Sequence, residues 1–322
     1  FAELMQQAVL RTTDRLETAA ADGRPINIAS EMMRLTLDIV TEALFSFDIT
    51  EQAAEIGEAM DTMTTIGKPR HRKVREAIDL LDHIVYAIIE ERLHHPQRER
   101  DDLLNMLLDS RYEDGSPMPV RQVRDEVMAL LVAGHETTAN TLSWTWYLLD
   151  QNPEVVARLE AEIDPLLGGR VPRVEDFSRL AYTDKVIQEA MRLYPSAWSI
   201  SRRALGDDDI GGYFIPAHSI VAMSPYTMHR HPDFWDDPVR FDPERFTPEQ
   251  IAARPRFAYF PFGGGARQCI GNNFAMMESL IIIPAIAGRF RLRRASTEPV
   301  EEHALVTLRP RDGIQVYVER RG

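Results

Sequence analysis

The chain has 322 residues, of which 44% are hydrophobic and 27% are charged, as is usual for a globular protein. Its formal net charge of -13 disfavours a nucleic-acid partner, because no excess of basic side chains is available to neutralise phosphates. A single cysteine excludes an intramolecular disulfide and a cysteine-rich zinc site, and it favours a reducing compartment.

Helical periodicity dominates the first two-thirds of the chain. Apolar residues recur at helical spacing over 1–21, 28–47, 53–65 and 74–93. The longest such pattern runs from Val120 to Gln151 and ends at Asn152-Pro153, and a helix of this length measures about 45 Å. Two further helices are predicted over 153–167 and 184–193.

From residue 199 the pattern changes to short alternating segments. Residues 213–215 and 219–222 are predicted to pair as strands, and 225–261 is proline-rich and irregular. A last helix is expected over 271–290, followed by strands at 305–308 and 314–318. The sequence therefore predicts one mainly α domain over 1–322 with a small β region.

The only cysteine lies in the segment 262–271, FGGGARQCIG. Three glycines let the backbone pass close to a flat cofactor, and a helix starting after Gly271 would favour thiolate at Cys269. Phe262 would shield the sulfur from water, and Arg267 would pair with an anionic group. A phosphate-binding loop is disfavoured, because no Walker lysine or strand–glycine–helix context is present.

Phe262, Gly265, Arg267, Cys269 and Gly271 match the signature Phe-x-x-Gly-x-Arg-x-Cys-x-Gly, and the chain resembles the cytochrome P450 family. The resemblance implies a cytochrome P450 fold in which Cys269 is the iron ligand of haem b (iron protoporphyrin IX). It also implies that Phe262, Arg267 and Gly271 contact this cofactor.

A second set of residues is predicted to hold the cysteine loop in place. Glu189 and Arg192 are three residues apart on one helix, and Arg245 follows within Pro-Glu-Arg-Phe. Alone, the first pair would be a surface ion pair, but the resemblance implies a buried structural network that shares Glu189. Arg202, with Arg203 as the alternative, and His229 are expected at the haem propionates, although His229 also suits a structural role.

The long helix contains the run Ala133-Gly134-His135-Glu136-Thr137-Thr138, which resembles the family pattern Ala-Gly-x-(Asp/Glu)-Thr-Thr. Ala133 and Gly134 either form a packing notch or leave room for dioxygen beside the haem, and the resemblance favours the latter. Thr137 is expected to donate to the carbonyl of Ala133 and to relay protons from Glu136, so these two are the predicted catalytic residues. His135 is expected to face away from the iron.

The resemblance implies a monooxygenase that inserts one oxygen atom from O2 into a small apolar substrate. Because no flavin, ferredoxin or nicotinamide motif is present, electrons would come from an NAD(P)H-fed ferredoxin or flavoprotein reductase. A peroxide-driven or isomerising enzyme and a non-catalytic haem-binding fragment remain alternatives. The expected pocket comprises residues of three segments: Met128, Leu131, Ala133, Ala197, Trp198, Ser199, Leu305, Val306 and Thr307.

The start of the chain differs from what the family leads us to expect. It opens on Phe1 inside a helical pattern, with no signal peptide, and lacks the Trp-x-x-x-Arg element of relatives before Val120. We therefore expect an N-terminally truncated, monomeric, cytoplasmic P450, with a membrane anchor in the missing region left open.

Overall fold

The computed structural model describes residues 1–47, 52–66, 68, 70–95 and 102–321. The predicted fold class, mainly helical with a small β region, is confirmed. The helices are α1 (Ala2–Asp22), α2 (Ile28–Phe45), α3 (Ala53–Ile66), α4 (Arg72–His94), α5 (Leu103–Asp109), α6 (Val120–Gln151), α7 (Pro153–Leu167), α8 (Ala181–Leu193), α9 (Pro225–Met228), α10 (Pro248–Ala253) and α11 (Asn272–Ala287).

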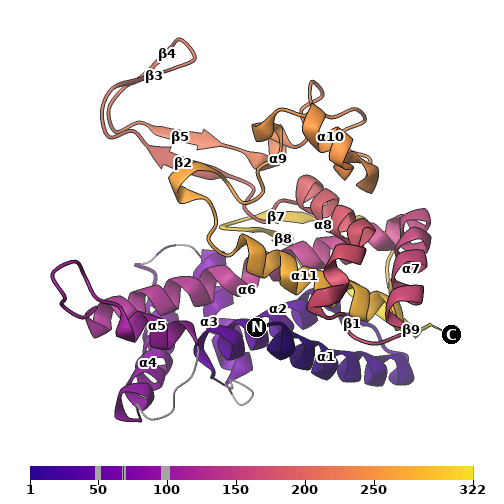
Figure 1. Ribbon diagram of the computed structural model, residues 1–322, viewed down its shortest axis with the longest axis horizontal. Helices are drawn as coiled ribbons and strands as arrows, with labels where there is room; N and C mark the ends of the chain where they lie inside the picture. Colours follow the sequence, from indigo (N-terminus) through magenta and orange to yellow (C-terminus); the bar gives the residue numbers. More distant parts are fainter. Residues whose placement is uncertain (48–51, 67, 69, 96–101, 322) are drawn as a thin grey trace.

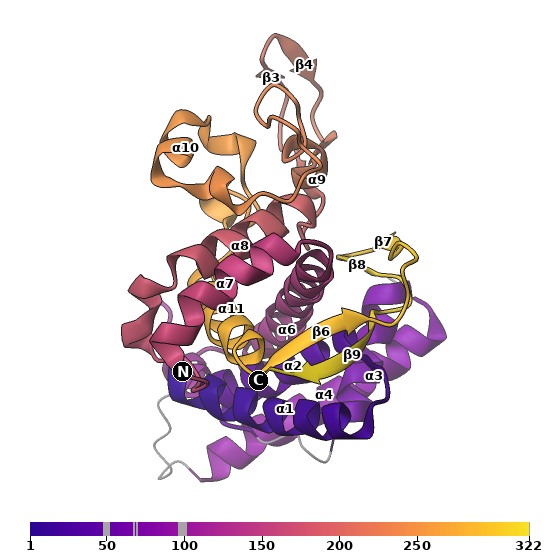
Figure 2. The ribbon, with the colours of Figure 1, turned by 90° about the vertical axis from the view of Figure 1, so that its right-hand side faces the viewer.

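Helix α6 is the central element, and α2, α4, α5, α7, α8 and α11 pack against it (Figures 1 and 2). Its C-terminal half joins a core built with α1, α2, α7, α8 and α11. Its N-terminal half joins a second core with α2, α3, α4 and α5. Because one rigid helix passes through both cores, side chains along a single face of α6 are held in a defined register.

In the part of the chain that the structure describes, the strands form four small antiparallel sheets. They are β1 (Ile26–Asn27), β2 (Ile200–Arg203), β3 (Asp208–Ile210), β4 (Tyr213–Ile215), β5 (Ile220–Met223), β6 (Phe290–Arg294), β7 (Glu302–Ala304), β8 (Leu308–Pro310) and β9 (Gln315–Arg320). Strand β9 pairs with both β1 and β6, which ties the C-terminus to the chain between α1 and α2.

Two strand predictions are wrong. Residues 213–215 pair with β3 and not with 219–222, because Gly211 and Gly212, both at positive φ, make the turn between β3 and β4. Strand β5 then pairs with β2. The β3–β4 hairpin extends beyond this β2–β5 pair and projects from the body (Figure 1). Residues 305–307 form the turn between β7 and β8, where the amide of Leu305 donates to the carbonyl of Thr307.

Within the described ranges, no helix is long and apolar enough to cross a membrane.

Candidate active site

Cys269 lies between a 3-10 turn, Gly265–Arg267, and the first turn of α11. Its amide donates to the carbonyl of Phe262 at 2.9 Å, which closes the loop on itself. The thiol is free and exposed, and α11 begins directly after Gly271. The N-terminal end of α11 therefore follows the sulfur closely along the chain.

Two separate structural reasons explain why glycine occupies three positions of this loop. Gly263 and Gly265 both have φ of 70°, a conformation that side chains disfavour. Gly264 is extended, but a Cβ there would lie 2.7 Å from Cε1 of Phe257. A larger residue at Gly264 would therefore require the exposed ring of Phe257 to shift, while backbone conformation favours glycine at its two neighbours.

The expected propionate ligand of β2 can be chosen from the strand geometry. A Cβ on Gly263 would lie 3.5 Å from Cδ1 of Ile200, so Ile200 faces the cysteine loop. Side chains alternate along a strand, so Arg202 shares that face and Arg203 points the other way. Arg202 is exposed, with Nη1 donating to the carbonyl of Ser201 at 2.9 Å. This placement supports Arg202 over Arg203.

His229 does not lie where a propionate contact requires it. Its side chain is fully buried, and its Nε2 accepts the amide of Phe260 at 2.9 Å. Burial lowers the pKa of His229 to about 3, with the guanidinium of Arg192 as a further cause, so the ring is neutral. His229 supports the segment leading into the cysteine loop, and the expected propionate contact is corrected to this structural one.

The structure brings Glu189, Arg192 and Arg245 together. Both oxygens of the fully buried Glu189 accept from Arg192, at 2.6 and 2.8 Å, and Nε of Arg245 lies 3.4 Å from Oε1. The remaining donors of Arg192 bind three carbonyls in the irregular segment, those of His229, Pro238 and Arg240. One buried arginine thus organises a stretch of chain that has little regular structure of its own.

On α6, Ala133 and Thr137 lie on the face that is open to solvent. Ala133 is exposed, and the hydroxyl of Thr137 donates to its carbonyl at 2.9 Å, the geometry expected from the sequence. Gly134 is placed differently, since a Cβ there would lie 2.9 Å from Cγ2 of Val40 on α2. The packing interpretation therefore accounts for Gly134, and α6 remains helical throughout the run.

Glu136 is buried and turned toward the β7–β8 turn. The hydroxyl of Thr307 donates to its Oε1 at 2.5 Å, and Nδ2 of Asn140 donates to the same hydroxyl at 3.1 Å. His135 lies on the side of α6 opposite Ala133 and Thr137, with its ring nitrogen 3.2 Å from the carbonyl of Leu131. Burial lowers the pKa of His135 to about 4, so this ring is neutral and faces away from the open side.

Three of the expected pocket residues are not on the open face. Met128 and Leu131 belong to the core between α6, α2 and α4, because they lie on the same side of the helix as His135. Thr307 is also buried, with its hydroxyl held by Glu136 and Asn140. These three positions were expected in the pocket from the family resemblance, and the packing of this chain buries them instead.

The remaining expected residues stay accessible. Val306 is 64% exposed at the tip of the β7–β8 turn, and Ser199 is exposed at the start of β2. Ala197 and Trp198 are half-buried, with the indole nitrogen of Trp198 donating to the carbonyl of Leu305 at 2.9 Å.

The prediction missed Ala129 and Leu130, which are exposed and half-buried on the same face of α6 as Ala133. Spacing of three and four residues before Ala133 was the signal that could have identified them.

The donor set fits a haem. An exposed cysteine thiol is one of the side chains that can ligate haem iron, and Arg202 and Arg267 offer exposed guanidinium groups to anionic substituents.

The comparison with known protein families is decisive for the family. The family model "Cytochrome P450" matches residues 1–318. The chain belongs to the cytochrome P450 family. This family implies haem as the cofactor of the P450 chain. Cyclooctatin synthase of Streptomyces melanosporofaciens is 38% identical over 310 residues, 91% of this chain and 67% of that protein.

Pentalenene oxygenase of Streptomyces avermitilis is 34% identical over 332 residues, 95% of the P450 chain and 74% of that protein. A crystal structure of a cytochrome P450, CYP102L1, superposes with a TM-score of 0.90 at 28% identity, covering 98% of this chain and 73% of that one. Against the Arabidopsis thaliana protein LUTEIN DEFICIENT 5, the chain spans 59% of the relative's length.

Proposed function

We propose that this P450 is a haem-thiolate monooxygenase that inserts one oxygen atom of O2 into a small apolar substrate. Electrons come from a separate ferredoxin or flavoprotein reductase fed by NAD(P)H. The observation that carries the proposal is the free, exposed Cys269 in its closed glycine loop at the start of α11.

Each element of the site has a distinct role in binding the cofactor. Cys269 would hold the iron of haem b, and Arg202 and Arg267 would pair with its propionates, while Phe262 limits access of water to the sulfur. When bound, the haem supplies an iron centre at which dioxygen is reduced and activated. The Glu189 network keeps the cysteine loop in the shape that presents the thiol.

Thr137 and Glu136 are the proposed proton-handling residues. Thr137 faces the open side, and its hydroxyl donates to the carbonyl of Ala133. The lone pairs of the hydroxyl oxygen can therefore accept a hydrogen bond from a water or another proton donor. Glu136 is held by Thr307 on the inner side of the helix. Passing a proton from Glu136 to Thr137 therefore requires the carboxyl group to turn away from Thr307, or a water to connect the two.

The open face of α6 supports an apolar substrate. Ala129, Leu130 and Ala133 present small or apolar side chains there, and Val306 adds an exposed apolar group from the β7–β8 turn. A relative named pentalenene oxygenase is in keeping with an apolar substrate class.

The test is spectroscopic. The reduced, carbon-monoxide-treated protein should show the long-wavelength Soret band of a thiolate-ligated haem, and Cys269→Ser should abolish it. Thr137→Ala should keep the band but divert electrons to hydrogen peroxide at the expense of product. Absence of the band in folded wild-type protein would refute haem-thiolate ligation, and turnover with peroxide alone would favour an enzyme without a redox partner.

A further inference from the structure

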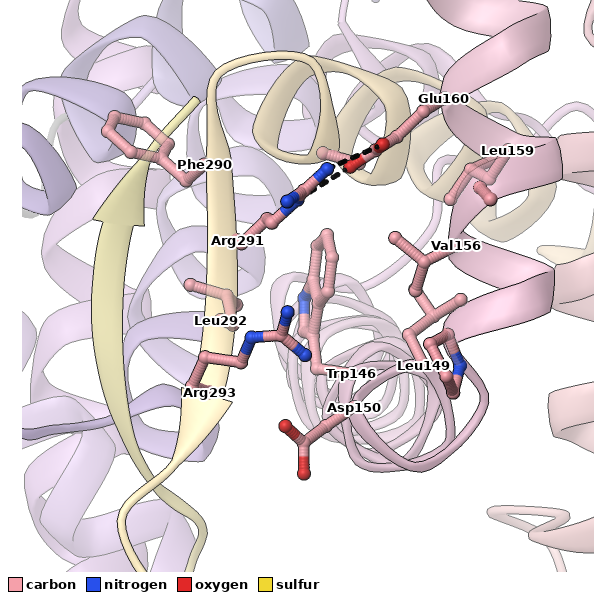
Figure 3. Close-up of a pocket in the computed structure, with 13 residues that line it drawn as sticks. Trp146, Leu149, Asp150, Val156, Leu159, Glu160, Phe290, Arg291, Leu292 and Arg293 are labelled. Carbon is pink, nitrogen blue, oxygen red and sulfur yellow. Dashed lines mark hydrogen bonds and ion pairs between the residues drawn. The ribbon is translucent and has the colours of Figure 1, made fainter. Parts of the chain in front are cut away.

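A separate pocket of about 170 Å³ lies at the C-terminal end of α6, where α7, the end of α11 and β6 meet (Figure 3). Its apolar lining includes Trp146, Leu149, Val156, Ala287 and Leu292. Trp146 lies nine residues beyond Thr137 on α6, which is about 13 Å along the helix axis. The pocket is therefore distinct from the open face that carries Ala133 and Thr137.

The volume of this pocket suits one six-membered ring. An engineered apolar cavity of about 150 Å³ in another protein takes up benzene, so a pocket of this size and lining admits a ligand of similar bulk. Ala157 and Pro153 of α7 are exposed at its edge, which leaves a path from solvent.

The charged groups at the mouth are unequally paired. Arg291 makes two hydrogen bonds to Glu160, at 2.9 and 3.0 Å, and Asp150 accepts from Nε of Arg294 at 2.8 Å. Arg293 has only a loose contact, with its Nε 3.8 Å from Glu319, and both of these side chains are about half exposed. Arg293 is therefore the guanidinium at the mouth most available to an anion.

The indole of Trp146 provides a second unmet donor. Its Nε1 is buried and finds no hydrogen-bond partner among the residues that the structure describes. Trp146 and Arg293 both line the pocket (Figure 3), so it holds two hydrogen-bond donors, one buried and one on a long exposed side chain. Because Arg293 is long and exposed, a small movement of its side chain would admit an oxygen that accepts from both groups.

We propose that this pocket binds a small monocyclic carboxylate. The ring lies among Leu149, Val156 and Leu292, and the carboxylate accepts hydrogen bonds from Arg293 and from Nε1 of Trp146. This site does not depend on haem or on the oxygenase function, and its ligand need not be a substrate.

The test follows the indole N–H signals of the four tryptophans in ¹⁵N-labelled full chain, reduced and carbon-monoxide-bound so that any haem is diamagnetic. Trp146→Phe assigns the signal of interest. Benzoate is the probe, and benzyl alcohol is the neutral ring of similar size. Ala157→Phe fills the pocket edge, and Ala161→Phe, equally exposed one turn along α7 but outside the lining, is its matched control.

Benzoate should shift the Trp146 signal saturably in the wild-type and Ala161→Phe proteins, and not in Ala157→Phe. Arg293→Gln should raise the benzoate Kd about 10- to 100-fold, the range set by losing one charge-assisted hydrogen bond. Benzyl alcohol should bind more weakly than benzoate. The proposal is overturned if millimolar benzoate leaves the Trp146 signal unmoved, if Ala157→Phe responds like the wild type, or if Arg293→Gln leaves the Kd unchanged.

Discussion

Replacing Thr307 by valine removes one hydroxyl while keeping the shape of the side chain nearly unchanged. In the native protein this hydroxyl donates to Glu136 at 2.5 Å and accepts from Asn140 at 3.1 Å, and all three side chains are buried. The substitution therefore leaves a carboxyl oxygen and an amide N–H without these partners and out of reach of water. Each such loss costs about 1–3 kcal/mol.

We expect Thr307→Val to lower the free energy of unfolding by about 2–6 kcal/mol, when the costs of both lost hydrogen bonds are combined. Urea denaturation followed by tryptophan fluorescence measures this change, with Thr307→Ser as the control because it keeps the hydroxyl. In the haem-loaded enzyme, the same variant should also lower turnover, since Glu136 loses the group that orients it. Equal stability of the valine and serine variants would refute the assigned hydrogen-bond network.

Three further predictions concern the scaffold. Glu189→Gln leaves buried guanidinium charge uncompensated and should cost about 3–5 kcal/mol in urea denaturation; a loss below 1 kcal/mol would contradict the buried network. Gly134→Ala should be destabilising because of its 2.9 Å approach to Val40, and adding Val40→Ala should restore stability if the steric reason is correct. The pKa values of His135 and His229 are lowered to about 4 and about 3, so the unfolded chain binds more protons below pH 6.5. The free energy of unfolding should therefore fall as the pH drops from 7 toward 4, by about 2 kcal/mol for each histidine at pH 5. Urea denaturation at pH 7 and pH 5 measures this change. Equal stability at the two pH values would contradict the burial of these histidines as neutral rings.

The sequence by itself predicted the features whose residues are close together along the chain. The fold class and the long central helix followed from apolar periodicity, because one helix or strand presents its faces at a constant spacing. The loop around Cys269 followed from ten consecutive residues, since glycine conformation and a helix start are local properties. The hydrogen bond from Thr137 to the carbonyl of Ala133 spans a single helical turn and was predictable for the same reason.

Only the tertiary structure decided which way these side chains face and which residues they contact. Thr307 lies 171 residues beyond Glu136, and nothing in either segment indicates that one hydroxyl orients the other. Met128 and Leu131 were expected in the substrate pocket from the family resemblance, but packing against α2 and α4 turns them into the core.

The same holds for the strands and for the pocket beside Trp146. Strand pairing depended on where the chain turns, which alternation alone does not specify. That pocket arises where α6, α7, α11 and β6 converge, so its residues share no sequence pattern. Local conformation is determined by neighbours in sequence, whereas burial, pairing and the partners of polar groups depend on segments that meet only after folding.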